Sequence, residues 1–189
     1  KSTFTWFMKF RKSLFINKST KIQKKLLPVK FPEDHNEKLL QYVILQEFII
    51  NRTFEEKCKF SIVTPLYEAK LPYLQEAAQS ILDQSYSNWE WIIVDDCSSK
   101  SASTKFVYEL AEQDNRVKVF SNEKNKGISE TTNHCIEKSS GDWIVFFDQD
   151  DLLHSNALSL INEEIYKKPD LRILYTDEDK IDEKGKHFD

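Results

Sequence analysis

Short apolar segments alternate with helical segments from residue 59 onward, and this order constrains the fold more than any other feature of the chain. Five apolar segments indicate buried strands, at 60–64, 89–94, 117–120, 143–147 and 171–176. Helical patterns lie between or after them, at 72–84, 101–115, 129–139 and 155–168. Strands that alternate with helices of this length predict right-handed crossovers and a mostly parallel α/β sheet with helices on both faces.

Acidic residues directly follow three of these predicted strands. They are Asp95 and Asp96, then Asp148, Asp150 and Asp151, then Asp177 and Asp179. In parallel sheets, ligands bind beyond the C-terminal ends of the strands. Because these acids all follow strand ends, we expect them to share one edge of the sheet, and this distribution indicates a site there.

The acids at 148–151 indicate a particular chemistry. Carboxylates packed closely together resist full ionisation unless a cation lies among them. Mg²⁺ and similar hard cations are held by one or two carboxylates, with substrate phosphates completing the shell. The segment therefore predicts an enzyme that handles a metal–nucleotide complex.

Glycine and cysteine usage excludes several other classes of site. The chain has three glycines, and neither GxGxxG nor GxxxxGK[ST] can be written with them. Its three cysteines form no CxxC pair, so a disulfide framework and a structural zinc site are not expected. This cysteine pattern favours a reducing compartment, the cytoplasm.

Charge divides the chain into two regions. Residues 1–30 hold nine Lys or Arg and no acid, which leaves 18 basic against 31 acidic residues, about −13, for 31–189. The basic and aromatic residues of 1–32 predict an anchor at the inner face of the membrane, a peripheral helix packed on the domain, or a partly ordered tail. Residues 33–51 predict an amphipathic helix. No apolar run reaches the length of a membrane span, and the acidic body disfavours nucleic-acid binding.

Spaced motifs in the second region resemble a known family. They lie at 60–68 (FSIVTPLYE), 80–90 (SILDQSYSNWE), 92–98 (IIVDDCS), 125–127 (NKG) and 146–153 (FFDQDDLL). Together they resemble family 2 glycosyltransferases of the GT-A fold over residues 59–189. The segment 175–182 (YTDEDKID) further resembles bacterial members that build surface polysaccharides. We therefore divide the chain into an N-terminal segment, 1–58, and a GT-A nucleotide-sugar-binding domain, 59–189.

The resemblance implies a donor of the UDP or dTDP type, Mn or Mg, and roles for individual residues. Pro65 and Tyr67 would border the base, with Glu68 nearby. Asp96 would accept a hydrogen bond from the pyrimidine, and Asp95 would position its loop. The acids of the DXD-like segment, Asp148 and Asp150, would bind the ribose and the metal, and Asp151 could replace either of them.

Simpler interpretations of the same residues stay open. Asp95 and Asp96 could cap a turn or helix, and the acids at 148–151 could form a solvated loop. Asp177 and Asp179, the candidate catalytic residues, could belong to a solvated turn. His134 and His154 lack the spacing of metal ligands, and Cys97 and Cys135 favour packing over nucleophilic chemistry. Cys97 also stands where the family usually has glycine.

The expected function is metal-dependent transfer of a sugar from a nucleoside diphosphate to a glycan or lipid-linked acceptor in surface polysaccharide synthesis. The alternatives are a non-catalytic GT-A-like module that docks at the membrane and a nucleotidyltransferase, which usually needs a glycine-rich phosphate loop. Family members continue past the fifth strand into an acceptor-binding half that supplies the catalytic base. We therefore expect this sequence to be the donor-binding part of a longer protein, with the base beyond Asp189.

Overall fold

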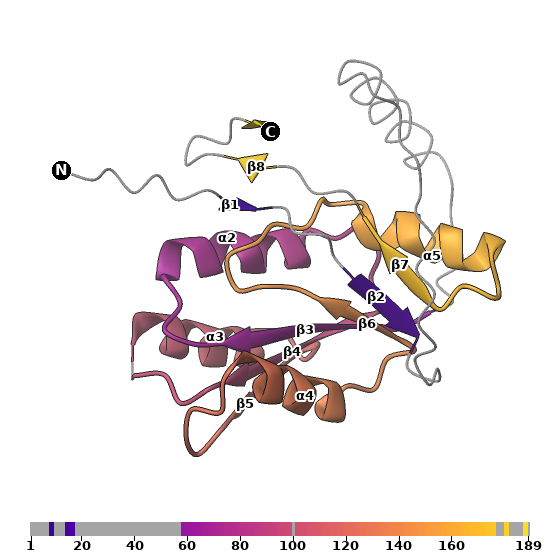
Figure 1. Ribbon diagram of the computed structural model, residues 1–189. Helices are drawn as coiled ribbons and strands as arrows, with labels where there is room; N and C mark the ends of the chain where they lie inside the picture. The colour runs from indigo at the N-terminus through magenta and orange to yellow at the C-terminus, as the bar shows by residue number, and fades with distance from the viewer. Residues whose placement is uncertain are drawn as a thin grey trace.

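A mostly parallel sheet organises the molecule. The structure is a computed structural model that describes residues 8–9, 14–17, 58–99, 101–176, 180–181 and 187–188. Within these residues a six-stranded sheet has the order β5-β4-β3-β6-β2-β7 (Figure 1). The strands are β2 (Leu14–Asn17), β3 (Phe60–Leu66), β4 (Trp89–Asp95), β5 (Val117–Ser121), β6 (Trp143–Phe146) and β7 (Ile173–Tyr175). The four neighbours from β5 to β6 pair in parallel, which confirms the predicted fold class.

Helices cover both faces of this sheet. They are α2 (Leu71–Leu82), α3 (Ala102–Gln113), α4 (Ile128–Lys138) and α5 (Ala157–Lys167). Figure 1 shows α4 below the sheet and α2 and α5 above it. Pro72 opens α2, where its missing N–H costs little. The Ser101 side chain caps α3 by accepting the Thr104 N–H at 3.3 Å.

The two faces of the sheet have separate apolar cores, as period-2 alternation requires. One core combines side chains of α2, α3 and α5 with strand residues such as Ile62, Trp91 and Val145. The other combines Cys135 of α4 with strand residues such as Val63 and Ile92. The strands of a sheet buried on both faces are nearly continuous apolar runs, which explains why the central segments were recognisable in the sequence.

The N-terminal region contributes a strand that the sequence did not predict. β2 lies between β6 and β7 and is antiparallel to both, with Phe15 opposite Val145 on one side and Leu174 on the other. A smaller antiparallel sheet joins β1 (Met8–Lys9), β8 (Lys180–Ile181) and β9 (His187–Phe188). The predicted amphipathic helix at 33–51 and the rest of the predicted membrane anchor lie outside the described residues. Among the helices that are described, none has the length and apolar character needed to span a bilayer.

Pro65 lies inside β3 rather than ending it. The prediction that this strand ends at residue 64 was therefore wrong. The strand can continue through the proline because β6 stops pairing with β3 at Val63, opposite Phe146. Val63 and Pro65 direct their backbone polar groups to the same side, since these directions alternate along a strand. The missing N–H of Pro65 therefore faces the side where β6 has already ended, while Pro65 still pairs with Val94 of β4.

Glu90 is a buried carboxylate at the opposite end of the strands, with 1% of its surface exposed. It accepts hydrogen bonds from the side chains of Lys59 (3.0 Å), Lys118 (2.8 Å) and Ser61 (2.7 Å). The Ser140 backbone N–H and hydroxyl also donate to it. Burial alone would raise the pKa of Glu90, but these donors outweigh it and hold the pKa well below the ordinary value.

Candidate functional site

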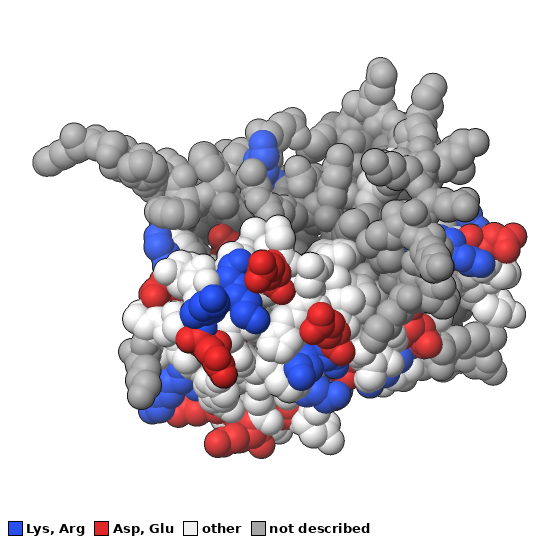
Figure 2. All heavy atoms as spheres, turned by 60° about the horizontal axis from the view of Figure 1, so that its bottom comes forward, with Lys and Arg blue, Asp and Glu red and all other residues white. Residues whose placement is uncertain are grey.

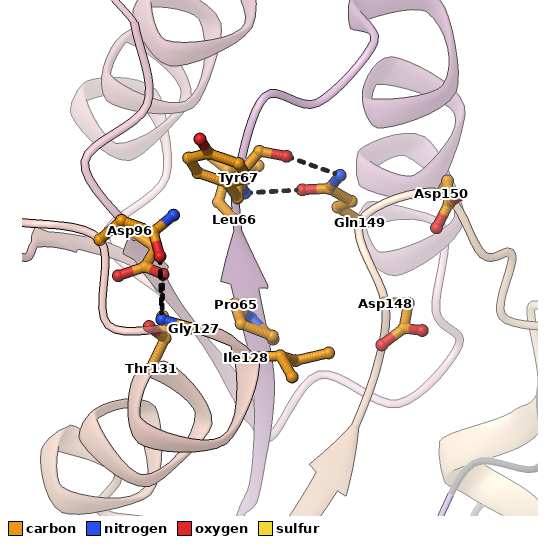
Figure 3. A pocket seen from close by; sticks show the side chains of 11 residues that line it. Pro65, Leu66, Tyr67, Asp96, Gly127, Ile128, Thr131, Asp148, Gln149 and Asp150 are labelled. Carbon is orange, nitrogen blue, oxygen red and sulfur yellow. Dashed lines mark hydrogen bonds between the residues drawn. The ribbon is translucent and has the colours of Figure 1, made fainter.

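A cavity lies where the central strands end. Its volume is about 390 Å³, within the usual range for small-molecule sites. The loops after β3, β4 and β6, together with the start of α4, contribute its walls. The lining residues are Pro65, Leu66, Tyr67, Asp96, Asn125, Gly127, Ile128, Thr131, Asp148, Gln149 and Asp150. Figure 3 shows Asp96 on one side of the end of β3 and the loop from Asp148 to Asp150 on the other.

Asp96 holds the loop that leads into α4. Its Oδ1 accepts the Asn122 side-chain amide and the Lys126 N–H, and its Oδ2 accepts the Gly127 N–H, each at 2.8 Å. Only 3% of Asp96 is exposed. Burial opposes its ionisation, but these donors and the Thr131 hydroxyl outweigh burial and lower its pKa. Because two of the donors lie at the start of α4, the positive end of the helix dipole also favours the ionised carboxylate.

The other side of the cavity carries two carboxylates, Asp148 and Asp150, with Gln149 between them. The Gln149 carboxamide accepts the Tyr67 N–H at 3.0 Å and donates to the Tyr67 carbonyl oxygen at 3.1 Å (Figure 3). The loop therefore reaches across to the end of β3. Both carboxylates and the aromatic side chain of Tyr67, which is 49% exposed, line the same cavity.

The carboxylates of Asp148 and Asp150 suit a cation that arrives bound to a ligand. Within the described residues, no three His, Cys, Asp or Glu side chains gather as a ready metal site. Two carboxylates beside a cavity match the way Mg²⁺ is bound, through one or two protein carboxylates with substrate phosphates and water completing the shell. Asp148 and Asp150 would hold such an ion, which would neutralise phosphate charge.

Three of the predicted site residues lie outside the cavity lining. Asp95 is buried and accepts the Ser98 N–H at 3.0 Å within the loop after β4. The carboxylate of Glu68 is turned to the loop after β4, where it accepts the backbone N–H and hydroxyl of Ser99, both at 2.8 Å. Asp151 is 6% exposed, and its N–H closes a turn onto the Asp148 carbonyl oxygen.

The candidate catalytic residues Asp177 and Asp179 lie outside the described residues. Their predicted role stays a prediction. So do the loop-positioning role of Asp95 and the metal, ribose and base contacts of Asp148, Asp150, Asp151, Pro65, Tyr67, Glu68 and Asp96.

Other cavity residues had no assigned role in the sequence. They are Leu66, Asn125, Gly127, Ile128, Thr131 and Gln149. The family-like motifs include all of these except Ile128 and Thr131, so they could have been considered there. Ile128 begins α4 and is 65% exposed despite its apolar side chain. An exposed apolar residue beside a cavity is suited to contact a ligand, but the helix predicted from the sequence began at residue 129, so the pattern assigned no role to Ile128.

The side chains of Cys135, Cys97 and His134 lie in different surroundings. Cys135 is buried in the core under α4, which raises the pKa of its thiol to about 12, so packing is its role as expected. Cys97 is exposed, so the packing role predicted for it was wrong. Its φ of +62° is a backbone conformation that favours glycine. His134 Nδ1 lies 2.9 Å from the Asn122 Oδ1 and thus supports the loop that Asp96 holds.

Comparison with known sequences identifies the family. The profile described as Glycosyl transferase family 2 matches residues 61–187. The chain therefore belongs to family 2 of the glycosyltransferases, and the resemblance in its motifs is confirmed. The chain is 41% identical over 129 residues to the uncharacterized protein y4gI of Sinorhizobium fredii, covering 68% of the chain and 14% of y4gI.

A second relative is the O-antigen biosynthesis protein RfbC of Myxococcus xanthus, 33% identical over 125 residues. This match covers 66% of the chain and 10% of RfbC, so the chain spans about a tenth of the length of these two relatives. Among solved structures, the 1–349 portion of S. aureus TarS in complex with UDP-GlcNAc superposes with a TM-score of 0.53 at 27% identity. That superposition covers 58% of this chain and 31% of the TarS chain.

Proposed function

We propose that this chain binds the donor in a metal-dependent glycosyltransferase. The donor is a nucleoside diphosphate sugar of the UDP or dTDP type, and the acceptor is a glycan or lipid-linked acceptor in the synthesis of a bacterial surface polysaccharide. The observation that carries the proposal is one cavity that brings Tyr67 and Asp96 together with Asp148 and Asp150. Family membership, the UDP-GlcNAc complex of TarS and the name of RfbC support it.

The two sides of the cavity suit the two ends of such a donor. Pro65 and Tyr67 offer apolar and aromatic surface to the base, and Asp96 lies at that side with the loop it holds. Asp148 and Asp150 face the diphosphate through a divalent cation. When bound, that cation would offset the negative charge that develops on the departing nucleoside diphosphate. The side chains of this chain hold the donor and orient it.

The described part of the face that carries α4 does not favour the alternative of a membrane-docking module. On the face that carries α4, Lys and Arg side chains lie among Asp and Glu side chains wherever residues are described (Figure 2). Membranes and nucleic acids recruit proteins through blocks of basic charge. A donor site therefore remains the function that the geometry supports best.

Thermal unfolding with ligand tests the proposal. With Mn²⁺ present and UDP or dTDP at one hundred times its Kd, we expect stabilisation of about 2.7 kcal/mol. For a chain of this size that raises Tm by about 5–10 °C. Asp150→Ala should abolish the shift because the cation loses a ligand. The control Asp170→Ala, which alters an exposed acid after α5, should keep it.

Calorimetric titration with a panel of nucleoside diphosphates, with and without Mn²⁺, would then identify the base. A wild-type chain that binds none of them, but binds anionic vesicles in a salt-sensitive manner, would overturn the proposal in favour of the docking module.

A further inference from the structure

The backbone ladder between β3 and β6 ends before it reaches the cavity. The paired residues run from Phe60 opposite Trp143 to Val63 opposite Phe146. The last backbone contact is the Phe147 N–H donating to the Val63 carbonyl oxygen at 3.1 Å. Pro65, the next residue of β3 that faces β6, has no N–H to offer. The loop after β6 that carries Asp148 and Asp150, called the carboxylate loop below, therefore leaves the sheet at a point where β3 cannot hold it by backbone pairing.

The side chain of Gln149 supplies the missing connection. Tyr67 follows Val63 and Pro65 in the strand alternation, so its backbone N–H and carbonyl oxygen also face the β6 side. The Gln149 carboxamide satisfies both groups, with Oε1 accepting at 3.0 Å and Nε2 donating at 3.1 Å. This is the pair of hydrogen bonds that a neighbouring strand would make. A nearer contact, the Thr64 hydroxyl donating to the Phe147 carbonyl oxygen at 2.9 Å, fixes only the start of the loop.

This bridge affects the site because of where Gln149 lies in the loop. It lies between Asp148 and Asp150, and Figure 3 shows all three in the wall of the cavity. Like charges repel, so two carboxylates on a loop without an anchor would move apart. Anchoring the residue between them restrains the backbone on both sides. A carboxamide can make this bridge and a carboxylate cannot, because only the amide both accepts and donates.

We propose that Gln149 is a positioning residue for the donor site, joining the carboxylate loop to Tyr67 so that the cation side and the base side of the cavity keep a fixed separation. The inference rests on the proposed function, since it assigns the two sides to one ligand. Gln149 touches neither cation nor base in this role. It acts through Asp148 and Asp150 on one side and Tyr67 on the other.

Substitution of Gln149 by an isosteric apolar residue tests the inference. Gln149→Met keeps the length of the side chain and removes both hydrogen bonds. The control Gln79→Met removes a side-chain hydrogen bond to Asp83 on the exposed face of α2. For each protein, the Mn²⁺ concentration at half-saturation is measured by calorimetry with UDP and with dTDP, and exchange of the Tyr67 amide is measured by NMR.

We expect Gln149→Met to raise the Mn²⁺ concentration at half-saturation about tenfold, as the loss of one or two net hydrogen bonds would. Exchange of the Tyr67 amide should also become faster. The control should leave both quantities at their wild-type values. If Gln149→Met binds the metal–nucleotide pair as tightly as the wild type, the inference is wrong and the proposed function stands. If the wild type binds no nucleoside diphosphate, the proposed function and the inference both fail.

Discussion

Glu90 shows at the residue scale how a buried charge can serve stability alone. It lies at the N-terminal ends of the strands, away from the cavity, and five hydrogen-bond donors from Lys59, Ser61, Lys118 and Ser140 surround its carboxylate. Removing one partner of a buried pair leaves the others without their acceptor. The two lysines are 36% and 43% exposed, so water can take over part of their solvation.

Glu90→Ala should therefore lower the free energy of unfolding by about 2 kcal/mol, toward the lower end of the range for buried pairs. The control is Glu109→Ala, which removes an exposed ion pair with Lys105 and should cost less than about 0.5 kcal/mol. Urea denaturation measures both. UDP affinity of the folded protein should not change in either variant. A loss equal to that of Glu109→Ala would show that Glu90 is solvated rather than paired.

Residue types and strand ends were enough to predict that Asp96, Asp148 and Asp150 share an edge of the sheet, but not what each acid contacts. Asp96 follows β4 in the sequence, yet its donors Asn122, Lys126 and Gly127 come from a loop 26 to 31 residues later. Glu68 was expected near the nucleotide, whereas Ser99 of the next loop holds its carboxylate. Gln149 carries no charge, so its contact with Tyr67 is evident only from the folded structure.

At the scale of elements, two glycines position loops for different physical reasons. Gly141 precedes β6, and a Cβ there would lie 2.6 Å from the Ser61 Oγ and 2.7 Å from the Lys59 carbonyl oxygen. Gly127 is the N-cap of α4 and has φ +80° and ψ +166°, a conformation essentially limited to glycine, but no atom lies within 4 Å of its Cβ position. The first glycine is required by space and the second by backbone conformation.

Alanine at these two positions should separate the two causes. Gly141→Ala should destabilise the fold by about 1–3 kcal/mol, since the backbone of β3 must shift, and it should leave UDP affinity of the folded protein unchanged. Gly127→Ala should cost about 1–3 kcal/mol as well, but it should also weaken UDP binding, because Gly127 lines the cavity and donates to Asp96. Urea denaturation and calorimetry provide the two readouts. Wild-type stability in Gly141→Ala would contradict the close contact with β3.

The local sequence pattern was sufficient to predict the strands and helices from β3 to β7, but it was not sufficient to predict β2. The strands that cross the middle of the sheet are apolar runs bounded by polar loops, so their positions followed from composition. Residues 14–17 hold three apolar side chains within a basic stretch, which specifies no partner. Their pairing with β6 and β7 joins segments more than 125 residues apart, and such pairing depends on the whole sheet.

At the scale of the whole molecule, several titrating groups act on stability in the same direction. Folding lowers the pKa of Glu90 and Asp96, where hydrogen bonds outweigh burial, and of Asp114, where the Arg116 guanidinium is the main cause. Each carboxylate contributes stability above its unfolded pKa, near 4, and loses it as pH falls toward the lower folded pKa. Burial lowers the pKa of His154, whose Nδ1 accepts the Asn156 N–H at 3.2 Å. Protonation of this ring therefore favours the unfolded chain below its ordinary pKa of 6.5.

Stability should thus fall on acidification in two stages. As the pH falls below 6.5, the unfolded chain binds a proton at His154 that the folded chain takes up only at lower pH, which gives a slope of at most about 1.4 kcal/mol per pH unit. Below about pH 4.5 the unfolded chain also binds protons at these carboxylates. The free energy of unfolding then falls more steeply with pH because several protons are taken up together. Urea denaturation from pH 8 to 3 measures the curve. His154→Gln should remove the first stage and keep the second, since glutamine has no titrating group. A wild-type curve that stays level down to pH 4.5 would show that His154 can be protonated within the folded protein, and the lower stage would then report on the carboxylates alone.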